Sequence, residues 1–210
     1  MMPGNMPETP EPPAGPWRLF VALPLPEPLR EGLQQWQRAA QRFMPEGLRW
    51  TPAAQWHLTL RFLGDVDPGE VSLLVEALEA ACAGQEPMRL WLHGFGCFPS
   101  PERPRVFWLG LTGELGPLER LQARVQEWTA PWGQKEDRPF RAHLTVARIR
   151  DGSPAARHGL GRVLTRLPAP PSAVWMVDRV TLFRSQLLPE GAVHTGLHVC
   201  WLGGSVRAAP

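Results

Sequence analysis

Residues 56–64 read WHLTLRFLG and residues 140–150 read FRAHLTVARIR, and both stretches place His, one spacer and Thr inside an alternating run of apolar residues. Successive side chains of a β-strand point to opposite faces, so residues i and i+2 share one face. We therefore expect two strands, each with a His and a Thr on its polar face. Two imidazoles, each beside a hydroxyl, are typical of an acid and a base that act on one phosphate.

Strict alternation assigns the residues of both strands to two faces. In the first strand His57, Thr59 and Arg61 share the polar face, and the buried face consists of Trp56, Leu58, Leu60 and Phe62. In the second strand the polar face holds Arg141, His143 and Thr145, and the buried face consists of Phe140, Ala142, Leu144 and Val146.

The basic residues are almost all arginine, since Lys135 is the only lysine among 22 basic residues. Arginine presents a planar fork that matches phosphate, so a phosphate site in this chain should be built from Arg. A GC-rich genome would by itself explain most of this bias. The net charge of +2 is weak evidence for nucleic-acid binding. Cys82, Cys97 and Cys200 form no C-x-x-C motif, which favours reduced thiols in a cytoplasmic protein.

The chain divides into one domain and two tails. Residues 1–16 are rich in Pro and contain neither Lys nor Arg, so they read as a disordered tail and not as a secretory signal. We expect a domain over residues 17–203 and a short tail over 204–210. No apolar run reaches the length of about 18 residues that a membrane span requires, so we expect no membrane contact.

Strand and helix signals alternate irregularly between these boundaries. Strands are predicted at 17–23, 88–98, 106–111, 175–184 and 192–202 in addition to the two His strands. Apolar spacing and Pro predict helices at 28–44, from Asp67 to Gly84, at 115–128 and at 153–167. This order favours an α+β fold with largely antiparallel sheets. Each half offers a strand, a helix and a His strand, which indicates a bilobal, pseudo-symmetric domain with one His-x-Thr motif from each lobe.

Other uses of these histidines have weaker support. A single His-x-Thr tripeptide is common by chance, and its ordinary explanation is a half-buried His bonded to a carbonyl. A catalytic metal would recruit Cys, Asp or Glu, and neither His strand provides one near its motif. His194 and His198 are four residues apart in a predicted strand, which separates them by about 13 Å. We therefore expect no metal and no cofactor, and the sequence contains no nucleophile elbow and no Gly-rich phosphate loop.

Several segments in order resemble the 2H phosphoesterases, and in particular the bacterial and archaeal RNA 2′,3′-cyclic phosphodiesterases, also called 2′-5′ RNA ligases. The segments are RLFVALPLP (18–26), WHLTLRFLGDV (56–66), GFGCFPSPERPRVFWLGL (94–111), PFRAHLTVARIR (139–150) and LFRSQLLPEGAVHTGL (182–197). The resemblance implies two antiparallel sheets flanked by helices around a central groove. It also implies metal-independent hydrolysis of RNA 2′,3′-cyclic phosphate ends, or of cyclic nucleotides, to 2′-phosphomonoesters.

The resemblance also assigns roles to individual residues. His57 would be the proton donor and His143 the proton acceptor, with Thr59 and Thr145 on the phosphate; sequence alone leaves open which imidazole is the acid. Arg148 matches a family arginine near the phosphate, although strict alternation places it opposite His143 unless a bulge or a strand end intervenes near Ala147.

Further features of the groove are expected with less support from the sequence. Arg61 is an alternative contact to phosphate or backbone, or else a solvated surface residue. The aromatic residues that could stack on a base are Phe62, Phe98 and Trp108. The family commonly has an aromatic hydroxyl where this chain has His194, and this chain contains no Tyr. We expect a monomer. The alternative functions are reversible 2′-5′ ligation of RNA ends and non-catalytic binding of RNA ends.

Overall fold

The computed structural model describes residues 15–134, 138–189 and 191–204. The strands are β1 (Trp17–Pro24), β2 (Leu48–Trp50), β3 (His57–Val66), β4 (Met88–Ser100), β5 (Arg103–Gly113), β6 (His143–Ile149), β7 (Trp175–Val177), β8 (Arg179–Leu188) and β9 (Gly191–Trp201). The helices are α1 (Glu27–Gln41), α2 (Val71–Cys82), α3 (Leu115–Trp128), α4 (Pro154–His158) and α5 (Gly161–Leu164), and the 3-10 turns are η1 (Ala53–Gln55) and η2 (Pro68–Glu70). Almost all of the two predicted tails lies outside the described residues.

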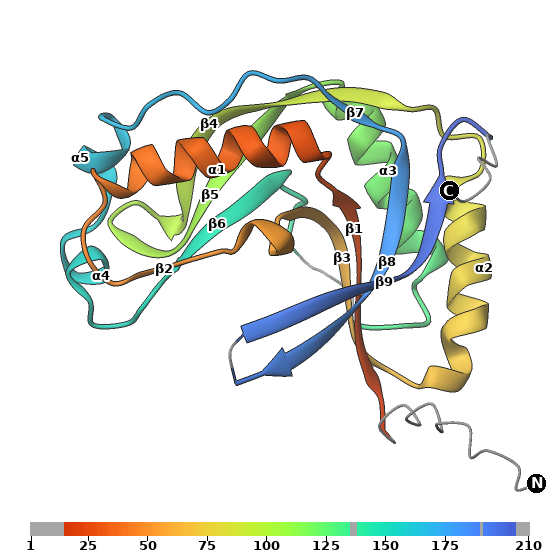
Figure 1. The fold of residues 1–210 in the computed structure, drawn as a ribbon. Helices are drawn as coiled ribbons and strands as arrows, with labels where there is room; N and C mark the ends of the chain where they lie inside the picture. The colour runs from red at the N-terminus through yellow and green to blue at the C-terminus, as the bar shows by residue number, and fades with distance from the viewer. Residues whose placement is uncertain (1–14, 135–137, 190, 205–210) are drawn as a thin grey trace, which may run out of the picture.

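The strands form two antiparallel sheets, which confirms the predicted α+β class (Figure 1). One sheet has the order β3-β1-β8-β9, and the other has the order β2-β6-β5-β4-β7. Apart from the extra strand β2, the two orders correspond, because each His strand lies beside the strand that leads into a long helix. Each sheet also combines strands from both halves of the chain, so the two lobes are interleaved.

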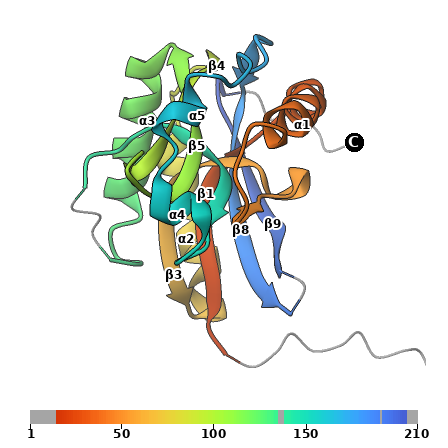
Figure 2. The ribbon, with the colours of Figure 1, turned by 90° about the vertical axis from the view of Figure 1, so that its left-hand side faces the viewer.

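The long helices cover the sheets on their outer sides. α1 contacts the five-stranded sheet, where the ring centroids of Trp36 and Phe107 are 6.2 Å apart. α2 and α3 contact each other and reach the four-stranded sheet through β9 and β3, and α1 and α3 lie on opposite sides of the strands in Figure 2. None of the helices in the described residues is both long and apolar enough to cross a membrane.

The predicted apolar face of α1 is buried as expected at Leu29, Leu33, Trp36 and Ala40, but Phe43 lies beyond the helix end and is 48% exposed. The predicted helix at Asp67 begins as the 3-10 turn η2, where the Asp67 carboxylate accepts a hydrogen bond from the Gly69 N–H at 2.7 Å. The helix predicted over 153–167 is wrong as a single element. It is divided into α4 and α5 because Gly159 adopts φ +70°, a conformation that favours glycine.

Candidate active site

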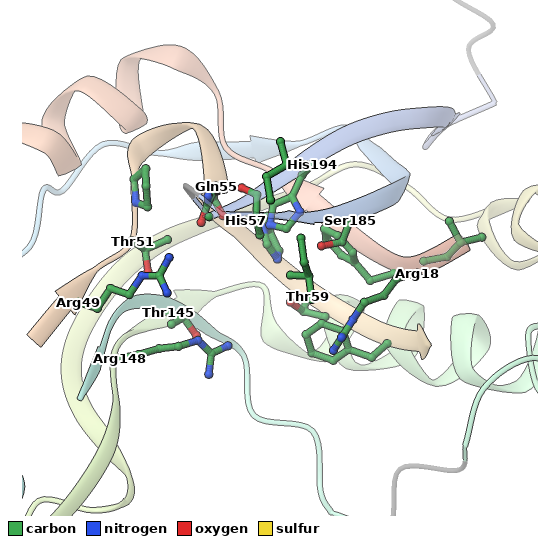
Figure 3. Close-up of a pocket in the computed structure, with 18 of the residues that line it drawn as sticks. Arg18, Arg49, Thr51, Gln55, His57, Thr59, Thr145, Arg148, Ser185 and His194 are labelled. Atoms are coloured by element: carbon green, nitrogen blue, oxygen red, sulfur yellow. Dashed lines mark hydrogen bonds between the residues drawn. The ribbon is translucent and has the colours of Figure 1, made fainter. Parts of the chain in front are cut away.

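A cavity of about 660 Å³ lies between the two sheets, and both motif histidines line it. Its walls come from β1, β2, β3, β6 and the β8–β9 hairpin (Figure 3). We call this cavity the central pocket. β3 and β6 contact each other directly, although they belong to different sheets. The expectation that His57 and His143 meet at one groove is therefore confirmed.

The two histidines are held in the same way by the chain just before them. The Nδ1 atom of His57 is 2.7 Å from the carbonyl oxygen of Gln55, and the Nδ1 atom of His143 is 2.7 Å from the carbonyl oxygen of Arg141. A carbonyl only accepts hydrogen bonds, so each Nδ1 carries the proton and donates it. In the neutral rings each Nε2 is therefore a free base, available to a ligand in the pocket.

A β-bulge occurs at the same place in both His strands. The residue three positions after each histidine, Leu60 in β3 and Val146 in β6, has no partner on the neighbouring strand. The extra residue reverses the alternation of faces for the residues that follow it, which in β3 extends as far as a second register shift at Leu63. Both strands consequently show the same order of buried and exposed residues over their first seven positions. The bulge turns Arg148 toward the central pocket, on the side of His143 and Thr145, and resolves the conflict with strict alternation.

Phe62 occupies the position in β3 that Arg148 occupies in β6, five residues after the histidine. Alternation placed Phe62 in the core, and that prediction is wrong. The bulge turns its ring toward the central pocket and leaves it 60% exposed. The groove therefore presents a guanidinium from one half of the chain and an aromatic ring at the equivalent place in the other half.

The same bulge explains why the expected position of Arg61 on the face of His57 is wrong. Arg61 is only 7% exposed and points away from the central pocket. Its guanidinium donates hydrogen bonds to the carbonyl of Gln126 and, at 2.8 Å, to the carbonyl of Trp132. Arg61 therefore anchors β3 to the end of α3 and is not available to a ligand in this groove.

The surroundings of the histidines favour their neutral forms. Burial first, then the charges of His194 and His143, lower the pKa of His57 to about 4, against the opposing effect of the Gln55 carbonyl. Burial and the charge of Arg148 lower the pKa of His143, although the Arg141 carbonyl opposes them. Burial also lowers the pKa of His194. All three imidazoles are therefore neutral near pH 7 when the pocket holds no anion.

Aromatic rings fix the orientation of both imidazoles. The Phe20 ring lies 4.7 Å from the His57 ring, and the Phe98 ring meets the His143 ring edge-on at 5.0 Å between centroids. Phe98 and Trp108 also pack against each other at 5.2 Å. Of the three aromatic residues considered for stacking on a base, only Phe62 lines the central pocket.

The LigT like Phosphoesterase family matches the sequence twice, over residues 23–108 and over residues 109–194. The chain belongs to this family. Each matched half contains one His-x-Thr motif, in agreement with the predicted internal symmetry.

Proteins called RNA 2′,3′-cyclic phosphodiesterase are similar to this member of the LigT-like family over most of its length. The protein of Thermus thermophilus is 34% identical, over 89% of this chain and 91% of its own length. The protein of Methanothermobacter thermautotrophicus is 29% identical, over 87% of this chain and 97% of its own length. The protein of Geobacillus stearothermophilus is 34% identical over 80% of this chain, which spans only 52% of that relative.

Solved structures of two similar proteins have the same fold. E. coli LigT complexed with 3′-AMP gives a TM-score of 0.72 at 29% identity, covering 90% of this chain and 99% of LigT. The protein TT0787 of Thermus thermophilus gives a TM-score of 0.70 at 32% identity, covering 89% of this chain and 98% of that protein.

Several residues of the site were not predicted from the sequence of this LigT-like chain. Gln55 accepts the His57 hydrogen bond through its carbonyl, and its side chain donates to the carbonyl of Ala192 in β9. His194 stands edge-on to His57 at 5.4 Å between centroids, and its buried Nδ1 has no hydrogen-bond partner in the described part of the chain. From the sequence we predicted no role for His194. The further polar residues that line the central pocket are Arg18, Arg49, Thr51 and Ser185.

Proposed function

We propose that this protein hydrolyses the 2′,3′-cyclic phosphate at the end of an RNA strand and leaves a 2′-phosphomonoester, without a metal ion. The observation that carries the proposal is the presence of two imidazoles in one pocket, each with Nδ1 bonded to a carbonyl and Nε2 free. In-line displacement at phosphorus needs a base on the side of the attacking water and an acid on the side of the departing oxygen. The relatives named RNA 2′,3′-cyclic phosphodiesterase support the same reaction.

In the proposed reaction His143 Nε2 takes a proton from water while the water oxygen forms a bond to phosphorus. The bond from phosphorus to O3′ breaks, and His57 Nε2 gives its proton to O3′. Thr59, Thr145 and Arg148 bind the non-bridging oxygens and stabilise the charge that develops on them. The reaction consumes one water. At its end His143 carries an extra proton and His57 has lost one, and proton exchange with solvent restores the starting state.

His57 must carry a proton before it can act as the acid. Because the pKa of His57 is lowered to about 4, few molecules of the free protein carry this proton at pH 7, so in this proposal the proton arrives together with the substrate. A cyclic phosphate carries one negative charge, which raises the pKa of a nearby imidazole. Binding of substrate and uptake of a proton are thus one coupled event in this proposal.

A simple incubation tests the proposed function. An RNA that ends in a 2′,3′-cyclic phosphate is mixed with protein and EDTA, and the terminal phosphate of the product is identified. We expect a 2′-phosphate, and we expect His57→Ala and His143→Ala each to lower turnover at least about 100-fold. Intact cyclic phosphate after incubation with wild-type protein would instead favour non-catalytic binding of RNA ends.

Two further parts of the proposal concern the direction of the reaction and the state of the protein. Hydrolysis is favoured over 2′-5′ ligation because water is abundant, and an assay that supplies a second RNA with a 5′-hydroxyl would detect a joined product. We also propose that the protein acts as a monomer, because strands of one chain supply all the proposed acid, base and phosphate-binding groups. We propose a cytoplasmic location because Cys82, Cys97 and Cys200 are all free thiols. Sedimentation of the purified protein tests the monomer.

A further inference from the structure

Two arginines face each other across neighbouring strands at one end of the central pocket. Arg49 of β2 and Arg148 of β6 are direct partners in the antiparallel register, and both line the pocket. Like charges directly opposite each other in a sheet are destabilising. Among the described residues no Asp or Glu lines the pocket, and neither arginine takes part in a salt bridge. This pair therefore offers an unneutralised binding place for anions.

The two guanidinium groups serve different parts of the groove. Burial and then the charge of Arg148 lower the pKa of His143, so Arg148 lies close to the reacting centre. Arg49 is not among the groups that shift the pKa of either motif histidine. Its Nη2 atom lies 3.4 Å from the point where a Cβ on Gly191 would stand, so Arg49 extends toward the β8–β9 hairpin. The guanidinium of Arg49 thus lies beside the β8–β9 hairpin.

Thr51 adds a hydroxyl beside Arg49. It lies two residues further along the chain and also lines the central pocket. Its backbone is fixed, because its N–H donates to the carbonyl of Val146 at 2.9 Å and its own carbonyl accepts from Gln37 at 3.2 Å. Within the described residues its side-chain hydroxyl has no hydrogen-bond partner. Arg49 and Thr51 therefore pair a guanidinium with a hydroxyl, as Arg148 and Thr145 do near the motif (Figure 3).

We propose that Arg49 and Thr51 form a second phosphate subsite, which binds the phosphodiester that joins the terminal nucleotide to the nucleotide before it. This inference rests on the proposed function. It makes the preferred substrate an RNA strand, or a cyclic nucleotide with a 5′-phosphate, over a cyclic nucleotide with a free 5′-hydroxyl. Arg49 would hold that phosphate by charge-assisted hydrogen bonds, and Thr51 would donate one more.

The test compares adenosine 2′,3′-cyclic phosphate with its 5′-phosphorylated form. We expect wild-type protein to favour the 5′-phosphorylated substrate in kcat/KM by at least about tenfold, the typical effect of charge-assisted hydrogen bonds. Arg49→Ala should abolish this preference and leave kcat/KM for the other substrate within about twofold. Thr51→Val should weaken the preference a few-fold. Arg38→Ala is the matched control, since Arg38 is an exposed arginine of α1 that does not line the pocket.

Two outcomes of the kinetic comparison would overturn the subsite. One is the absence of any preference in the wild-type protein. The other is an equal loss on both substrates in Arg49→Ala, which would put Arg49 on the reacting phosphate. If neither substrate is hydrolysed, the proposed function fails. The existence of the subsite can then still be tested by calorimetry, which measures the binding of adenosine 2′-phosphate and of adenosine 2′,5′-bisphosphate. Arg49→Ala should then weaken only the bisphosphate, and equal affinities of both ligands for wild type and variant would overturn the proposal.

Discussion

The dependence of turnover on pH tests the proposed pair of histidines in a quantitative way. Burial and the charges of His194 and His143 lower the pKa of His57 to about 4, so at pH 7 roughly one free molecule in a thousand carries a proton on this ring. Burial also lowers the pKa of His143 from its ordinary value of 6.5. The reactive form needs a proton on His57 and none on His143. The fraction of molecules in this form is highest between the two pKa values and falls about tenfold per pH unit above the upper one.

The assay measures kcat and KM for adenosine 2′,3′-cyclic phosphate over a wide pH range at constant ionic strength. The ratio kcat/KM reports the free protein, and we expect it to be highest between a pH of about 4 and the lowered pKa of His143, and to fall at higher pH. The optimum of kcat reports the complex, and it should lie at higher pH because the bound anion raises both pKa values. A maximum of kcat/KM on the alkaline side of neutrality would refute the reasoning.

One substitution isolates a single cause of the low pKa. The charge of His194 contributes to lowering the pKa of His57, so His194→Gln should move the pH range of highest kcat/KM upward. His198→Gln is the matched control, because His198 lies on the same strand but does not line the pocket and bonds to Glu79 at 2.9 Å. An unchanged pH profile in His194→Gln would remove His194 from the explanation.

Three further experiments separate roles within and beside the groove. A 3′-deoxynucleoside 2′-(4-nitrophenyl phosphate) has a leaving group that needs no acid. We therefore expect His57→Ala to regain most of its activity on this ester, while His143→Ala stays inactive. The opposite pattern would show that His143 is the acid and His57 the base. Arg61→Ala leaves two partly buried carbonyls without a donor, which should lower the free energy of unfolding by about 1–3 kcal/mol in urea titrations. An unchanged midpoint would contradict this anchoring role. Phe62→Ala should raise KM about tenfold if the exposed ring stacks on the terminal base, Phe62→Trp should restore it, and equal KM values in all three proteins would exclude stacking.

The sequence predicted the parts of the fold that depend on local patterns. The His strands, the buried face of α1 and the antiparallel α+β class follow from apolar spacing and from Pro and Gly positions. Alternation also placed His57, Thr59, His143 and Thr145 correctly on the groove side. These predictions succeeded because each depends on only a few neighbouring residues.

The predictions failed where the strand geometry departs from simple alternation. The bulges at Leu60 and Val146 add one residue to each strand, so Arg61 and Phe62 exchanged faces relative to the prediction. An exposed Phe next to a buried Arg is the reverse of ordinary hydrophobic patterning, and no local feature of the β3 sequence predicts it. The sequence did contain a hint for β6, because the family resemblance placed Arg148 near the phosphate, which strict alternation allows only with a bulge or a strand end near Ala147.

The pairing of strands that are distant along the chain could not be predicted from local sequence patterns either. β1 lies between β3 and β8, more than a hundred residues apart along the chain, and no local pattern encodes such a neighbour. The β8–β9 hairpin consequently places His194 beside His57, and no sequence motif predicts this contact. Arg49 was missed for a related reason, since its meaning comes only from its register with Arg148.

The bulge that β3 and β6 share turns a different residue into the groove from each strand, so the two halves of the groove are not equivalent. Two similar halves with like strands would accept a ligand equally well in either of two opposite orientations. At the fifth position after the histidine this equivalence ends, because one half carries Phe62 and the other carries Arg148. A nucleotide has a flat apolar end and a charged end, so under the proposed function it would match these two sites in only one sense, and that sense would determine which ester oxygen of the cyclic phosphate faces which imidazole.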